Sequence, residues 1–120
     1  MPSVVLIGHG SKARGFDAAM RKVARALKRQ GRYREVTCAF LEVASPSIPE
    51  AVRDCVLNGA REVRILPYFV LTGKHVTRDI PLIVSEAVKK HRGRSRIVLC
   101  PYLGYHEKIV SVVQERIGHV

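Results

Sequence analysis

Short apolar runs alternate with amphipathic segments along the whole chain. Four of these runs predict buried β-strands, at residues 3–7, 35–41, 62–69 and 96–100. Their apolar character is continuous rather than alternating, which is typical of strands covered on both faces in a parallel sheet.

Between these runs, apolar residues recur at the 3.6-residue spacing of helices. The spacing predicts four helices. The first covers residues 13–30, the second runs from a cap at Ser47 to Asn58, the third starts at residues 77–79, and the fourth covers residues 105–117. Ser47 and Glu50 have the spacing of a capping box. The faces expected to be buried are Phe16, Ala19, Met20, Val23 and Leu27; then Ile48, Ala51, Val52, Cys55 and Val56; then Ile80, Ile83, Val84, Ala87 and Val88; and finally Ile109, Val112, Val113 and Ile117.

The regular β-α order predicts an α/β fold: a single four-stranded parallel sheet flanked by helices on both faces, with right-handed crossovers. Residues 1–120 are expected to form one domain. Four strands leave two edges of the sheet exposed, which indicates a homodimer.

Composition narrows the class of protein. Apolar residues make up 47% and charged residues 26%, and no apolar run approaches the ~20 residues of a membrane span. The short apolar stretch at the amino end has no basic region before it, which argues against a signal peptide. Three cysteines without a C-x-x-C pair argue against a zinc ribbon or a disulfide framework. These features favour the cytoplasm.

The net charge of +11 is the one extreme property and indicates an anionic partner. Nucleic acid, an anionic membrane surface and a polyacidic small molecule all satisfy this charge. The few aromatic residues form no stacking stripe, and the basic residues form no recognition motif, so we expect neither a nucleic-acid nor a membrane partner. A solvated basic surface remains an alternative.

Chemically versatile residues follow the predicted strands. His9 stands between two glycines after the first strand, Glu42 follows the second, His75 follows the third and His106 follows the fourth. Ligands of open parallel sheets bind beyond the carboxyl ends of the strands, so we expect His9, Glu42 and His75 to meet there. Two imidazoles and a carboxylate suit exchangeable Co²⁺, Ni²⁺ or Fe²⁺. A structural loop histidine and an ordinary surface acid are the alternatives, and His91 is expected to be solvated.

Four segments at these positions, LIGHGS, FLEVASPSIPEAV, LPYFVLTGKHVTRDIP and CPYLGYHEKI, resemble the small sirohydrochlorin chelatases, the short-form cobaltochelatases. The resemblance covers nearly the whole chain in order. Its most specific piece is the G-x-H-x-x-x-D-I-P pattern of residues 73–81.

The resemblance implies a chelatase-like fold, one flavodoxin-like half. It implies insertion of a divalent metal, Co²⁺ first and Ni²⁺ or Fe²⁺ as alternatives, into sirohydrochlorin with release of two protons. No permanently bound cofactor is expected. By this resemblance His9 and His75 bind the metal, His9 also accepts pyrrole protons, and we count Glu42 with them as catalytic.

The resemblance also implies residues that contact the substrate. These are Ser45, where many relatives carry an acid, and the loop of Val70, Leu71, Thr72, Gly73 and Lys74, with Gly10, Ser11 and His106 as further contacts. Larger chelatases of this fold resemble two such units fused, which again predicts a dimer. A basic nucleic-acid module and a metal carrier without chelatase activity remain the competing functions.

Overall fold

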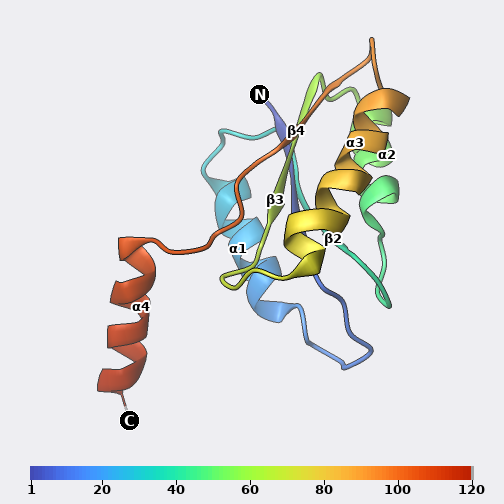
Figure 1. Ribbon diagram of the computed structural model, residues 1–120. Coiled ribbons are helices and arrows are strands. Elements are labelled where there is room, and N and C mark those ends of the chain that lie inside the picture. Colours follow the sequence, from blue (N-terminus) through green and yellow to red (C-terminus); the bar gives the residue numbers. More distant parts are fainter. Residues whose placement is uncertain (120) are drawn as a thin grey trace.

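Four parallel strands form one sheet in the order β2-β1-β3-β4 (Figure 1). The strands are β1 (Ser3–Gly8), β2 (Val36–Phe40), β3 (Glu62–Pro67) and β4 (Arg96–Leu99), close to the predicted ranges. The structure is a computed structural model and describes residues 1–119. Strand order reverses between β1 and β3, and such a switch point is where open parallel sheets bind ligands.

Five helical segments connect or follow the strands. They are α1 (Ala18–Arg29), α2 (Ile48–Leu57), the π-helical turn η1 (His75–Asp79) continuing into α3 (Ile80–Lys90), and α4 (Glu107–Gly118). The four predicted helices are therefore confirmed. None of the helices in residues 1–119 is long and apolar enough to cross a bilayer.

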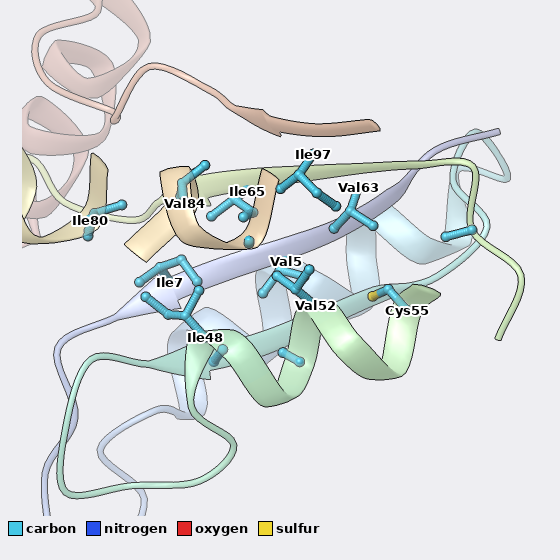
Figure 2. Packing of buried hydrophobic residues seen from close by; sticks show 14 residues of the cluster. Val5, Ile7, Ile48, Val52, Cys55, Val63, Ile65, Ile80, Val84 and Ile97 are labelled. Atoms are coloured by element: carbon cyan, nitrogen blue, oxygen red, sulfur yellow. The ribbon is translucent and has the colours of Figure 1, made fainter. Parts of the chain in front are cut away.

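Two apolar clusters lie on opposite faces of the sheet. On one face α2 and α3 pack against the strands (Figure 2), and the labelled members of that cluster are Val5, Ile7, Ile48, Val52, Cys55, Val63, Ile65, Ile80, Val84 and Ile97. On the other face α1 contributes Met20 and Ala24, and the strands contribute Val4, Leu6, Cys38 and Phe40. The predicted sheet with helices on both faces is confirmed.

The first and third helices differ from the prediction in their limits. Helix α1 begins at Ala18, not at residue 13, because Gly15 has a left-handed φ of +76°, which interrupts a right-handed helix. Phe16, predicted to be buried on this helix, precedes it and is 40% exposed. Ala19 and Val88, also predicted to be buried, are exposed. The third helical segment begins at His75, because the turn η1 precedes α3.

Helix α4 forms where predicted, but its predicted burial is wrong. Val112, Val113 and Ile117 are exposed, and within residues 107–118 no side chain is buried. Figure 1 shows α4 standing apart from the layered body. The prediction failed because helical periodicity shows that a face must be buried, but not against which surface.

His91 was predicted to be solvated, and this is wrong. It ends α3 and is only 7% exposed, and this burial lowers the pKa of its imidazole. The thiols of Cys38 and Cys55 are buried, and burial raises the pKa of Cys55 to about 12. A thiol that stays protonated is a poor metal ligand, so these cysteines act as apolar core residues.

The predicted capping box at the start of α2 is confirmed. Ser47 Oγ accepts a hydrogen bond from the Glu50 N–H, and Glu50 Oε1 accepts one from the Ser47 N–H at 2.9 Å. The bond from the Ser47 backbone is the main reason why the pKa of the Glu50 carboxyl is lowered. The capping box therefore satisfies the N–H groups of Ser47 and Glu50 at the start of α2.

We expect Ser47→Ala to lower the free energy of unfolding by about 1 kcal/mol, because one N–H at the start of α2 loses its acceptor. Urea unfolding at neutral pH measures this loss. The control is Ser85→Ala, at an exposed position inside α3, which should leave stability unchanged or slightly raised. Equal stabilities for both variants would contradict the cap.

Candidate metal site

The structure brings His9, Glu42 and His75 together at the carboxyl ends of the strands. His9 directly follows β1, Glu42 follows β2, and His75 opens η1 after β3. Each offers one ligand atom, and these atoms all lie within 4.8 Å of one another. The cluster, called the metal-ligand cluster below, therefore lies beside the β1/β3 switch point.

The three side chains contact one another closely and remain open to solvent. His9 Nε2 is 2.8 Å from Glu42 Oε1, and the His9 and His75 rings meet edge to face with centroids 4.7 Å apart. About half of each side chain is exposed. Because the donors are nitrogen and oxygen on an open surface, the cluster suits a divalent ion that enters and leaves.

Asp79 positions His75, a contact that the sequence analysis missed. The Nδ1 atom of His75 is 2.9 Å from Asp79 Oδ2, which leaves Nε2 as the nitrogen available to a metal. A carboxylate behind a ligating imidazole fixes the tautomer and orientation of the ring. Hydrogen bonds from Arg78 and, to a smaller extent, His75 lower the pKa of the Asp79 carboxyl. The signal was the i,i+4 spacing of His75 and Asp79.

We expect Asp79→Asn to weaken Co²⁺ binding by roughly 10- to 100-fold, because the His75 ring loses its charged partner. Isothermal titration with Co²⁺ measures the change. The matched control is Asp54→Asn, which removes an exposed carboxylate paired with Arg53 on α2 and should leave the affinity unchanged. An unchanged affinity for Asp79→Asn would show that the carboxylate does not support the ligand.

Backbone contacts between two loops place His9 beside Glu42. The Leu41 N–H donates to Gly8 O, and the Glu42 N–H donates to His9 O, both at 3.1 Å. Gly10 has a φ of +113°, and a Cβ atom there would lie 1.8 Å from the carbonyl oxygen of Glu42. Only glycine allows this approach.

Local strain accompanies this arrangement. Val43, next to Glu42, has a φ of +70°, a conformation that a β-branched residue rarely adopts. Strained backbone of this kind persists where the surrounding structure holds it, and it is common at functional sites.

The other predicted contact residues lie at or near the same edge. Ser45 is exposed on the loop after Glu42, and the loop of residues 70–74 is exposed throughout, with Leu71 80% exposed. Ser11 Oγ accepts a hydrogen bond from the Ala13 N–H, so Ser11 stabilises its own loop. His106 lies outside the metal-ligand cluster and caps α4, its Nδ1 accepting from the Lys108 N–H at 3.1 Å.

A hollow of about 240 Å³ adjoins His9. Its walls are largely apolar and include Phe16, Met20, Phe40 and Tyr68. An apolar surface beside a metal-ligand cluster is suited to the body of a ligand that carries or receives the ion.

The structure is thus that of an α/β protein with a candidate metal site, two imidazoles and a carboxylate at the carboxyl edge of a parallel sheet. The CbiX family model matches residues 3–120, and the chain belongs to the CbiX family. It is 34% identical to the chloroplastic sirohydrochlorin ferrochelatase of Arabidopsis thaliana over 97% of this chain and 51% of that protein. It is 28% identical to the sirohydrochlorin cobaltochelatase of Sulfolobus acidocaldarius over 97% of this chain and 89% of that protein.

The fold matches solved structures as well. The sirohydrochlorin chelatase SirB of Bacillus subtilis subspecies spizizenii, in complex with cobalt, aligns with a TM-score of 0.86 at 26% identity, over 100% of this chain and 51% of SirB. The chain therefore spans about half the length of SirB and of the Arabidopsis relative.

Proposed function

We propose that this protein inserts a divalent metal ion into sirohydrochlorin, a polycarboxylate tetrapyrrole. The observation that carries the proposal is the convergence of His9, Glu42 and His75, with ligand atoms within 4.8 Å of one another. The names of the relatives, sirohydrochlorin ferrochelatase and cobaltochelatase, support the same substrate.

In this proposal the metal ion is a substrate that His9 and His75 hold before transfer. A set without thiolate binds borderline ions less tightly than a structural zinc site does, so the ion can pass to the four nitrogens of the macrocycle. Asp79 keeps the His75 ring oriented throughout, since it contacts the nitrogen that the metal does not use.

His9 also accepts pyrrole protons, because a macrocycle must lose two N–H protons as the metal enters. Once the ion leaves, Nε2 of His9 is free to take one proton as a general base, and it passes this proton to solvent water before it takes the second. The carboxylate of Glu42, 2.8 Å from that nitrogen, stabilises the resulting imidazolium. In this scheme Glu42 lies beside the metal ion before transfer and stabilises the protonated His9 after it.

The exposed residues at this edge contact the substrate in the same scheme. Leu71, with 80% of its surface exposed, offers an apolar contact to a flat macrocycle, and Lys74 offers a cation to its carboxylates. Val70, Thr72, Gly73 and Ser45 complete the surface. The net charge of +11 attracts a polyanionic substrate and raises the encounter rate.

We propose Co²⁺ as the metal, with Ni²⁺ and Fe²⁺ as alternatives that the same ligands accommodate. The protein acts as a homodimer of single-domain chains in a reducing compartment such as the cytoplasm. Neither a nucleic acid nor a membrane is part of the scheme.

The test is an absorbance assay with sirohydrochlorin and Co²⁺, with and without the protein. We expect the spectrum of the tetrapyrrole to change faster with the protein present, and Ni²⁺ and Fe²⁺ assays to rank the metals. Binding of Co²⁺ without any binding of sirohydrochlorin would identify a metal carrier instead. Salt-sensitive DNA binding without tetrapyrrole affinity would favour a nucleic-acid module.

A further inference from the structure

A hollow lined by arginines lies at the amino ends of β3 and β4, the edge of the sheet opposite the metal-ligand cluster. Its volume is about 420 Å³, a size that accommodates a small organic molecule. We call it the arginine hollow. Its charged lining residues are Arg61, Arg92, Arg94 and Arg96, and Val88 and Ile97 form an apolar wall.

These arginines carry more positive charge than their surroundings neutralise. Within residues 1–119, Arg61, Arg92 and Arg94 form no ion pair. Arg96 is 3.4 Å from Glu62 Oε1, but Glu62 also accepts a hydrogen bond from Arg64 Nε at 2.6 Å. One carboxylate is therefore shared between two guanidinium groups. Helices α2 and α3 end at this edge, and each helix end adds only about half a negative charge.

The backbone around the hollow is held in place by hydrogen bonds between two loops. Ser95 Oγ donates to Ala60 O at 2.6 Å, and the Arg96 N–H donates to Arg61 O at 2.8 Å. The turn between α3 and β4 closes with a bond of 3.1 Å from the Ser95 N–H to His91 O. Figure 1 shows this turn, in orange, at the top, where α3 ends. A preformed frame of this kind lowers the cost of ordering a site when a ligand binds.

We propose that the arginine hollow binds an oligophosphate, with the phosphates on the guanidinium groups. Guanidinium groups donate paired hydrogen bonds to phosphate oxygens, and arginine remains charged at any physiological pH. Several cations around one small hollow match the several charges that an oligophosphate carries on adjacent groups. Val88, which is 38% exposed, and Ile97 offer an apolar contact to an organic part of the ligand.

This inference goes beyond the proposed function and does not depend on it. The arginine hollow contains none of the residues of the metal-ligand cluster. A chain without chelatase activity can still bind an oligophosphate, and an active chelatase can fail to do so. The metal-insertion assay and an oligophosphate titration therefore fail separately.

Calorimetric titrations of the wild-type protein at physiological salt test the ligand class. The probes are ATP, inorganic triphosphate and citrate, and we expect both triphosphates to bind more tightly than citrate. Tighter binding of ATP than of inorganic triphosphate would support contact of the organic part with the apolar wall. Equal affinities would support recognition of the phosphates alone. Failure of both triphosphates to bind at millimolar concentration, or citrate binding as tightly, would overturn the proposal.

A pair of double variants tests the arginines themselves. Arg61→Gln with Arg94→Gln should weaken triphosphate binding by roughly 10- to 100-fold, because hydrogen bonds to charged groups are lost. The matched control is Arg25→Gln with Arg29→Gln, which removes the same charge from exposed positions on α1. Equal weakening by both double variants would show attraction to net charge alone and would overturn the site.

Amide NMR signals locate the bound anion. On addition of inorganic triphosphate, the signals of Gly93 and Ser95 should shift, while those of Gly10 and Gly73, at the metal-ligand edge, should stay in place. Shifts at Gly10 and Gly73 without shifts at Gly93 and Ser95 would place the anion at the opposite edge of the sheet. That result would overturn the proposal, whatever the affinity.

Discussion

His9→Ala is expected to abolish the acceleration of metal insertion into sirohydrochlorin, and His75→Ala is expected to do the same. Either change leaves one imidazole and one carboxylate, which is too small a set to hold a borderline divalent ion in a defined place. His9→Ala also removes the proposed proton acceptor, and a positioned general base contributes roughly 10²- to 10⁴-fold to a rate. The initial rate with Co²⁺ measures both effects.

A separate titration with Co²⁺ distinguishes the two proposed roles of His9, metal binding and proton acceptance. Both alanine variants should bind Co²⁺ more weakly than the wild type, and Glu42→Gln should retain some binding while slowing insertion. The matched control is His119→Ala, at the exposed end of α4, which should bind and react as the wild type does. Wild-type rates for both His9→Ala and His75→Ala would remove the site from the mechanism.

Gly10→Ala is expected to weaken Co²⁺ binding as strongly as His9→Ala or His75→Ala does, although Gly10 is not one of the proposed metal ligands. Its Cβ would lie 1.8 Å from the Glu42 carbonyl oxygen, so the two loops must separate and the bond from Glu42 N–H to His9 O must break. We expect the free energy of unfolding to fall by about 1–3 kcal/mol. Co²⁺ affinity should be lost as well, because His9 and Glu42 move apart.

Gly15→Ala is the matched control for this prediction. Gly15 also has a positive φ, +76°, but a Cβ there would meet open space. The variant should lose about 1–2 kcal/mol from backbone strain alone and keep its Co²⁺ affinity. Denaturant unfolding and Co²⁺ titrations of the two variants distinguish backbone strain, present in both, from the steric clash with the Glu42 carbonyl oxygen, present only in Gly10→Ala. Equal metal affinities for both would contradict the role of the close approach at Gly10.

The convergence of His9, Glu42 and His75 could be predicted from the sequence because the fold brings these distant residues to one edge of the sheet. His9 and His75 each follow a strand, and parallel neighbours β1 and β3 end side by side, so hydrophobic patterning alone places both histidines together. Glu42 follows β2, on the other side of β1, and joins them for the same reason.

Other features depended on contacts that no local pattern contains. Gly10 is required by the carbonyl of Glu42, which another loop supplies. Asp79 is a different case: its i,i+4 spacing from His75 was a local signal, but the predicted helix start at residues 77–79 left His75 outside the helix, so the two residues were not paired. A buried face of α4 was predicted from spacing, but none of its side chains is buried, because spacing does not identify the surface against which a helix packs.

The position of the metal ion tests the central claim most directly. Crystals of the protein soaked in Co²⁺ and measured at the cobalt absorption edge should show one anomalous peak between His9 and His75, about 2 Å from a nitrogen of each ring. A peak held by other residues, or rings of His9 and His75 that turn away from the ion, would contradict the account.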